Sequence, residues 1–157
     1  MNKLLVIDDD FLWVANVRDK LTQHGFAIHH TPNALEGLEW ARALLPDIII
    51  LDLLFPQQPV RGEDILMTLK QDERTRGIPI IIYSIKGFDH ATREFISRYS
   101  LSPIVPRESA AQGHIIIGHK WEMQELENYV LGLTDPPKRA RVIRVGTHAL
   151  ELGEGYR

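Results

Sequence analysis

The chain of 157 residues is long enough for one domain with an appendage and for a sizeable buried core. Its 18 basic and 21 acidic side chains give a net charge of −3, which provides no electrostatic basis for binding nucleic acid or membrane, and the absence of cysteine excludes disulfides, thiol catalysis and thiolate metal sites. With no signal-peptide pattern and no apolar run near the roughly 20 residues that span a bilayer, the sequence predicts a soluble, cytoplasmic protein.

Apolar runs alternate with stretches of helical periodicity along the first half of the chain. They predict strands at residues 3–7, 27–31 and 47–51 and helices at residues 11–24, 33–45 and 62–72. Asp10 is a candidate N-cap of the first helix, Gly25 ends that helix, and Pro46 ends the second. The chain therefore begins as repeated strand–helix units.

The second half continues the alternation. Strands are predicted at residues 78–84 and 103–106, and helices at residues 88–99 and 119–133. Repeated strand–helix units imply right-handed crossovers and a parallel sheet that is covered on both faces. We therefore expect an α/β fold in one domain that spans residues 1–133.

Two segments depart from this alternation. Residues 110–118 contain the run His114-Ile115-Ile116-Ile117, which fits the first turn of the last helix, an extra strand or a contact surface. Residues 134–157 are interpreted as a linker and C-terminal extension with two strand-like pieces at 142–145 and 149–152. They are too few to form a stable domain alone. They predict a docked hairpin, a dimerisation element or the start of an output domain.

Acidic residues follow the first and third predicted strands. Residues 3–7 are succeeded by Asp8, Asp9 and Asp10, and residues 47–51 by Asp52. In a parallel sheet the carboxyl ends of the strands meet at one edge, where ligands bind. Carboxylates that converge there repel one another unless a cation intervenes, and oxygen ligands favour Mg²⁺. The sequence thus predicts a Mg²⁺ site beside a carboxylate that could receive a phosphoryl group.

Four segments in register resemble the receiver domain of two-component response regulators. They are the acidic segment 6–10, the segment 47–56 around Asp52, the segment 78–84 that ends on Ser84, and the segment 104–109. The resemblance covers about residues 1–133. It implies a doubly wound five-stranded parallel sheet of order 2-1-3-4-5 with flanking helices, as in chemotaxis regulators, plus a short C-terminal extension.

The resemblance also implies a role for each matching residue. Asp52 would be the phosphorylated aspartate, Ser84 would hydrogen-bond the phosphoryl oxygens, and Arg107 would pair with them where the family has lysine. Mg²⁺ would be held by Asp8, Asp9, Asp52 and the backbone carbonyl of Leu54. The implied function is signalling rather than enzymatic turnover: a sensor histidine kinase or phosphotransfer protein phosphorylates the domain, and a protein-interaction surface switches.

Four features differ from the usual family pattern. Arg107 replaces lysine with a wider, planar cation. Ile85 follows Ser84 where a small residue is usual, and Ile104 stands where many receivers carry an aromatic side chain. Residues 57–61 make the loop after the acceptor about two residues longer than usual. These departures leave an alternative open, in which a pseudo-receiver binds its partner without phosphorylation.

Other assignments follow from the same residues. Leu54 occupies the position at which aspartyl phosphatases usually carry a second Asp, and the acidic residues 8–10 would repel the phosphate of a flavin, so both of those classes are disfavoured. The resemblance leaves a homodimer open, and binding to nucleic acid would require an output domain outside this sequence. Four histidines lack ligand-type spacing and are interpreted as surface or loop residues: His29, His30, His114 and His119.

Overall fold

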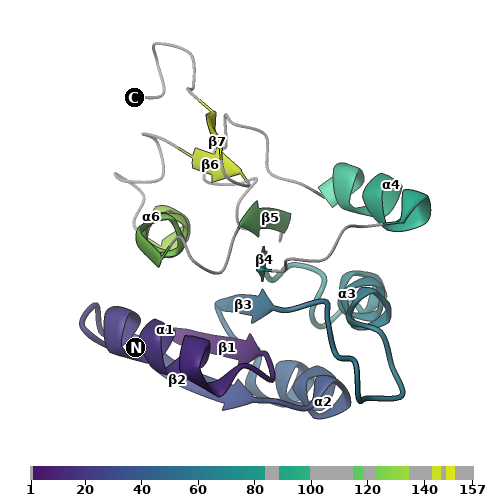
Figure 1. The fold of residues 1–157 in the computed structure, drawn as a ribbon, viewed down its shortest axis with the longest axis horizontal. Helices are drawn as coiled ribbons and strands as arrows, with labels where there is room; N and C mark the ends of the chain where they lie inside the picture. Colours follow the sequence, from purple (N-terminus) through teal and green to yellow (C-terminus); the bar gives the residue numbers. More distant parts are fainter. Residues whose placement is uncertain are drawn as a thin grey trace.

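The computed structural model describes residues 2–83, 89–99, 115–118, 123–134, 143–145 and 148–150. Its centre is a parallel sheet of order β2-β1-β3-β4-β5 with helices on both faces (Figure 1). The strands are β1 (Lys3–Ile7), β2 (Ala27–Thr31), β3 (Ile48–Leu51), β4 (Ile80–Tyr83) and β5 (Ile115–Gly118). The helices are α1 (Phe11–Thr22), α2 (Ala34–Leu44), α3 (Gly62–Gln71), α4 (His90–Tyr99) and α6 (Met123–Thr134). The predicted fold class and strand order are confirmed.

The central strands are continuously apolar because both of their faces are buried. Leu4 and Val6 of β1 pack in the core layer that α1 and α6 cover, whereas Leu5 and Ile7 pack in the layer that α2 and α3 cover. Burying one such side chain contributes about 1.5–3 kcal/mol. The two layers therefore fix β1 and β3 side by side, and with them the residues that follow each strand.

The helix boundaries of the first half follow local signals. Asp10 caps α1, since its side chain accepts a hydrogen bond from the backbone N–H of Trp13, as predicted. Asn33 caps α2 in the same way by accepting from the N–H of Glu36. Gly25, with a φ of 82°, lies in the turn between α1 and β2, where a left-handed backbone favours glycine.

The position of the fifth strand was predicted wrongly. Residues 103–106 lie outside the described residues, and the strand that pairs with β4 is β5, in the register Ile80↔Ile115 to Tyr83↔Gly118. The reason is chemical. Residues 103–106 contain two prolines, which cannot donate to a strand ladder, whereas Ile115, Ile116 and Ile117 are β-branched and suit a buried strand.

The C-terminal extension forms a hairpin in the part that is described. β6 (Ile143–Val145) and β7 (His148–Leu150) pair antiparallel, and β6 contacts α6 and β5. The described part of the extension is therefore a hairpin that lies against α6 and β5. Among the described residues, no helix is both long enough and apolar enough to cross a membrane.

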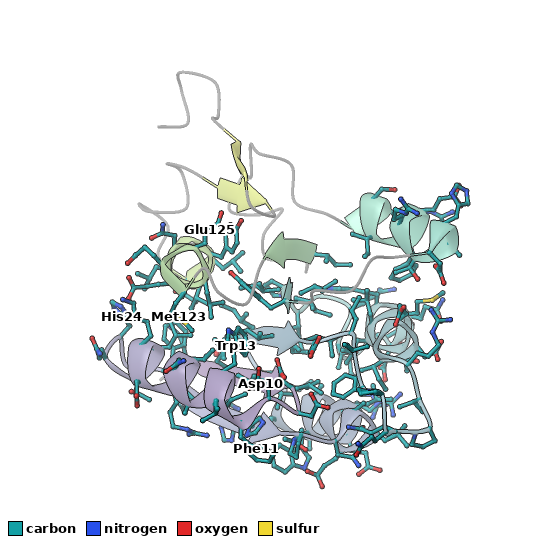
Figure 2. The ribbon with its side chains drawn as sticks, in the orientation of Figure 1. Asp10, Phe11, Trp13, His24, Met123 and Glu125 are labelled. Atoms are coloured by element: carbon teal, nitrogen blue, oxygen red, sulfur yellow. The ribbon has the colours of Figure 1, made fainter. Side chains whose placement is uncertain are left out.

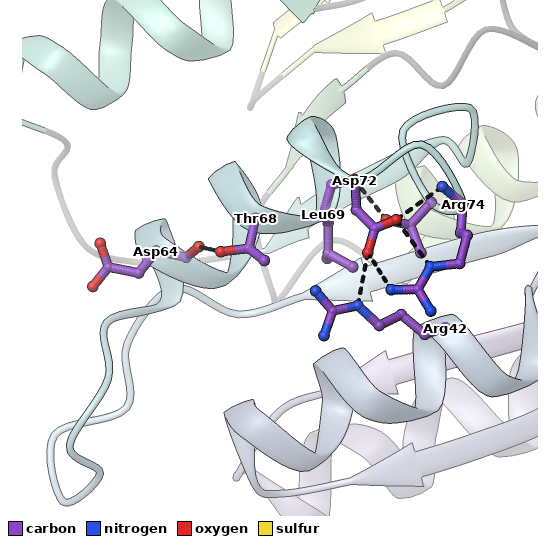
Figure 3. Close-up of polar contacts among 7 residues, drawn as sticks. Arg42, Asp64, Thr68, Leu69, Asp72 and Arg74 are labelled. Carbon is purple, nitrogen blue, oxygen red and sulfur yellow. Dashed lines mark hydrogen bonds and ion pairs between the residues drawn. The ribbon is translucent and has the colours of Figure 1, made fainter.

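The turn between α3 and β4 is tied to α2 by an ion-pair network (Figure 3). The Asp72 carboxylate accepts from Arg42 Nε at 2.7 Å and from Arg74 Nη2 at 2.9 Å, and the Arg74 backbone N–H adds a bond of 2.9 Å. The hydrogen bonds from Arg74, followed by that from Arg42, hold the pKa of Asp72 well below its usual value. This network lies at the amino ends of the strands, opposite the acidic residues that follow β1 and β3.

Candidate functional site: an acidic cluster at the carboxyl edge of the sheet

Three carboxylates converge where β1 and β3 end. The strands pair in the register Ile7↔Leu51, so Asp8 and Asp52 are neighbours, and the Asp52 N–H donates to the Ile7 carbonyl at 3.0 Å. One carboxylate oxygen from each of Asp8, Asp9 and Asp52 lies within 4.8 Å of the other two. Asp8 and Asp52 are buried and Asp9 is exposed. The predicted convergence of these residues is therefore what the structure shows.

The loop between β1 and α1 holds the acidic residues by its backbone. The Asp8 N–H donates to the Thr31 carbonyl of β2 at 3.1 Å, and the Asp10 N–H donates to Asp8 Oδ1 at 2.8 Å. Asp10 then caps α1, which Figure 2 shows with Asp10, Phe11 and Trp13 at its start. Each acidic residue thus has a separate place: Asp8 is buried, Asp9 is exposed beside it, and Asp10 begins the helix.

The loop after Asp52 is fixed by close packing. Asp52 Oδ1 accepts from the Leu54 N–H at 3.1 Å, and the side chains of Leu53 and Phe55 are buried. A Cβ atom at Gly62 would overlap the backbone of Leu53, so only glycine lets α3 begin this close to the loop that follows Asp52. The backbone of α3 therefore supports the segment that carries Asp52.

Residues 57–61, which lengthen the loop after Asp52, are held in place by side-chain hydrogen bonds of Gln58 and Arg61. Gln58 bridges to the β2–α2 turn, since its Nε2 donates to the Pro32 carbonyl at 2.8 Å and its Oε1 accepts from the Ala34 N–H at 2.7 Å. Arg61 Nη2 donates to Glu63 at 2.8 Å and to Asp89 at 3.0 Å. The bonds to Glu63 and then Asp89 raise the pKa of Arg61, which stays a cation. The longer loop is thus part of the packed structure.

The other predicted site residues lie outside the described residues: Ser84, Ile85, Ile104 and Arg107. Ser84 follows Tyr83, the last residue of β4, in the sequence. The role of Arg107 presumed a strand that ends just before it, whereas the strand beside β4 ends at Gly118. His119 and Lys120 come next in the sequence after β5. The roles of Ser84 and Arg107 stay predictions.

Sequence reasoning missed two residues near the cluster. His30, interpreted as a surface or loop residue, lies partly buried on β2 with its Nε2 2.8 Å from the Asp8 carbonyl oxygen. The signal was available, because Thr31 pairs with Ile7 and parallel strands end at the same edge of the sheet. Gln58 had no comparable signal, since its partners come from a loop distant in the sequence.

The donor set of the cluster fits a hard divalent cation. Carboxylate and carbonyl oxygens are the ligands of Mg²⁺, which usually takes one or two carboxylates and keeps several waters. Negative charges this close repel one another, and a cation between them would remove that repulsion. Asp8, Asp9 and Asp52 would supply such ligands from two different loops.

The model of the response regulator receiver domain family matches residues 4–100. The polar-differentiation response regulator DivK of Brucella anthropi is 32% identical over 109 residues, which cover 66% of this chain and 87% of DivK. The DNA-binding dual master transcriptional regulator RpaA of Synechocystis is 30% identical over 106 residues, which cover 62% of this chain and only 43% of RpaA.

Solved structures show the same fold. A response regulator receiver domain protein (CheY-like) from Methanospirillum hungatei superimposes with a TM-score of 0.66, covering 88% of this chain and 98% of that one. The identity is 16%, so this similarity concerns the arrangement of the strands and helices alone.

Proposed function

Since this chain belongs to the response regulator receiver domain family of two-component signalling, we propose that Asp52 accepts a phosphoryl group from a histidine kinase or phosphotransfer protein. The observation that supports this most strongly is the position of Asp52, which is buried at the end of β3 with carboxylate oxygens of Asp8 and Asp9 within 4.8 Å. We also propose residues 1–133 as the receiver domain, residues 134–157 as its extension, and the cytoplasm as its location.

The transfer conserves atoms and charge as follows. A carboxylate oxygen of Asp52 forms a bond to the phosphorus of a phosphohistidine, the phosphorus–nitrogen bond breaks, and the imidazole nitrogen keeps the bonding electron pair and takes a proton. A bound Mg²⁺ supplies positive charge against the incoming phosphoryl oxygens. Asp8 and Asp9, together with Asp52 and the Leu54 carbonyl, would hold that ion.

A hydroxyl and a side-chain cation complete the proposed site. Ser84 follows β4 directly and would donate to a phosphoryl oxygen. Arg107 is the cation proposed from the family pattern. Because β5 ends at Gly118, Lys120 is a second candidate, two residues beyond the strand that borders β4. Lysine is also the residue that the family uses, which favours Lys120 over Arg107.

An apolar rim beside the acidic cluster supports a protein phosphodonor. Phe11 and Leu12 follow Asp10 at the start of α1 and are 64% and 83% exposed, and Leu54 is partly exposed two residues after Asp52. Large exposed apolar side chains that adjoin a buried reactive group are typical of a protein contact surface. We propose this rim as the place where the donor protein docks.

DivK and RpaA are response regulators by name, and RpaA is described as DNA-binding, but this chain matches less than half of RpaA. We propose that phosphorylation switches a protein-interaction surface, with a homodimer as one form of that interaction. Contact with nucleic acid would belong to a further output domain.

Intact-protein mass spectrometry tests this function. The protein is incubated with a small phosphodonor, with and without Mg²⁺, beside the variants Asp52→Asn, Arg107→Ala and Lys120→Ala. We expect one phosphoryl addition that requires both Mg²⁺ and Asp52. The lifetime of the phosphoryl group on Asp52 should change in either Arg107→Ala or Lys120→Ala. The variant in which it changes identifies the side-chain cation of the site. A folded protein that gains no phosphoryl group would favour the phosphorylation-independent module.

A further inference from the structure

His30 is the side chain that joins β2 to the acidic loop. Its Nε2 lies 2.8 Å from the Asp8 carbonyl oxygen. A carbonyl oxygen can only accept, so Nε2 must carry the hydrogen and donate it. The ring is also held by Phe11, whose ring centroid is 5.4 Å away in an edge-on arrangement at 86°. The imidazole is therefore fixed between α1 and the peptide that follows Asp8.

The peptide between Asp8 and Asp9 is the one that His30 restrains. Its oxygen is the Asp8 carbonyl oxygen, and its N–H belongs to Asp9. The preceding peptide is held separately, because the Asp8 N–H donates to the Thr31 carbonyl at 3.1 Å. Asp9 is exposed and follows directly. The orientation of this peptide plane sets the direction in which the chain continues to Asp9, and so contributes to where the Asp9 carboxylate lies relative to Asp8 and Asp52.

We propose that His30 is a positioning residue of the metal site: by donating to the Asp8 carbonyl it fixes the Asp8–Asp9 peptide and keeps the Asp9 carboxylate within the acidic cluster. This inference rests on the proposed Mg²⁺-dependent function. In this role His30 is not itself a metal ligand and acts through the peptide that it holds. Residues that orient metal ligands from outside typically contribute 10–100-fold to metal affinity.

The neighbouring histidine provides a matched control. His29 lies on the same strand, but successive side chains of a strand point to opposite faces. It lines a pocket of about 330 Å³ with Trp40, Ala43 and Leu44 of α2, away from the acidic loop. A substitution at His29 therefore perturbs β2 without removing the bond to Asp8.

The test compares His30→Leu, His30→Gln and His29→Leu in the full chain. The first readout is the Mg²⁺ dissociation constant from calorimetry. We expect His30→Leu to weaken binding about 10-fold. His30→Gln, whose amide N–H can reach the same carbonyl, and His29→Leu should bind within about twofold of the unsubstituted protein.

The second readout needs no metal. Amide hydrogen exchange in Mg²⁺-free protein should be faster at Asp9 and Asp10 in His30→Leu, and unchanged there in His30→Gln and His29→Leu. Unchanged exchange in His30→Leu, or equal loosening in His29→Leu, would overturn the role of His30. Failure of the unsubstituted protein to bind Mg²⁺ would instead refute the proposed metal-dependent function, since the exchange experiment decides the role of His30 alone.

Discussion

Carboxylates lie at both edges of the sheet, in opposite electrostatic surroundings. At the amino ends of the strands, Asp72 receives hydrogen bonds from the guanidinium groups of Arg42 and Arg74 (Figure 3). At the carboxyl ends, Asp8, Asp9 and Asp52 place carboxylate oxygens within 4.8 Å of one another. At the amino edge, arginine side chains neutralise the carboxylate. At the carboxyl edge, three carboxylates lie close together.

The difference separates a structural use of a carboxylate from a functional one. The chain supplies its own cations to Asp72, and the product is a fixed turn between α2, α3 and β4. An accumulation of carboxylates opposes folding by mutual repulsion, and a cation taken from solution would remove that repulsion. Removing a carboxylate charge should therefore lower stability at the amino edge and raise it at the carboxyl edge.

The largest loss of stability is expected at the carboxyl edge of the sheet, where the backbone of α3 packs against the loop that follows Asp52. In Gly62→Ala the new Cβ would overlap the backbone of Leu53, which cannot move without displacing the loop that carries Asp52. We expect the unfolding free energy to fall by about 1–3 kcal/mol, typical of overpacking. Gly37→Ala is the comparison, because its Cβ would meet the side chain of Ile7 and not the backbone of a loop. Denaturant titration should show the smaller loss in Gly37→Ala, and an equal loss would contradict this account of the loop.

Asp72→Asn should lower the thermal midpoint at neutral pH, because the two guanidinium groups lose their anionic partner. The folded pKa of Asp72 is held below its usual value, so its stabilisation is present above about pH 4 and is lost as the pH falls further. The variant should therefore approach the unsubstituted protein in acid. Asp64→Asn, in the first turn of α3, is the control and should have little effect on how the thermal midpoint depends on pH. A parallel loss in both variants would show that the network is not specific.

Asp52→Asn should act in the opposite direction. Without Mg²⁺, removing one charge from the acidic cluster relieves repulsion, and Asn Oδ1 can still accept from the Leu54 N–H. We expect the thermal midpoint to rise and the unfolding free energy to increase by about 1 kcal/mol. This is the scale of the repulsion between two like unit charges about 4 Å apart in water. Thermal unfolding in a chelator measures this. A destabilised Asp52→Asn would indicate that the carboxylate is structural, like that of Asp72.

The smallest effect is expected at Asp89→Asn. The Asp89 side chain accepts from the Thr92 N–H at 2.7 Å at the start of α4, a bond that Asn can keep. What is lost is the ion pair with Arg61, whose two side chains are both about half exposed. Exposed pairs contribute little. The midpoint at neutral pH should not change measurably, whereas a clear drop would show that Arg61 couples α4 to the acceptor loop more strongly than its exposure suggests.

The first half of the fold was predictable because its signals are local. The apolar runs of β1 and β3, the cap at Asp10 and the acidic residues after each strand all lie within a few residues of the feature that they specify. Parallel pairing then brings Asp8 and Asp52 together. The family resemblance supplied the strand order 2-1-3-4-5, which the structure confirms.

The remaining features depend on contacts between distant segments. The fifth strand was predicted at residues 103–106 from the strand–helix alternation, and an extra strand was only one of three interpretations of residues 110–118. His30 and Gln58 acquire their roles from loops that are brought beside them by the fold. Side-chain bonds to backbone atoms of another loop have no pattern in a single sequence, so such residues are found only once the strands are in place.

A calorimetric titration with Mg²⁺ of the unsubstituted protein and of Asp8→Asn tests the central claim most directly. We expect one Mg²⁺ site in the unsubstituted protein and a large loss of affinity in Asp8→Asn, whose fold is retained because Asn Oδ1 can still accept from the Asp10 N–H. Equal binding in both proteins, or no binding to the folded unsubstituted protein, would contradict the claim that the acidic cluster is a cation site.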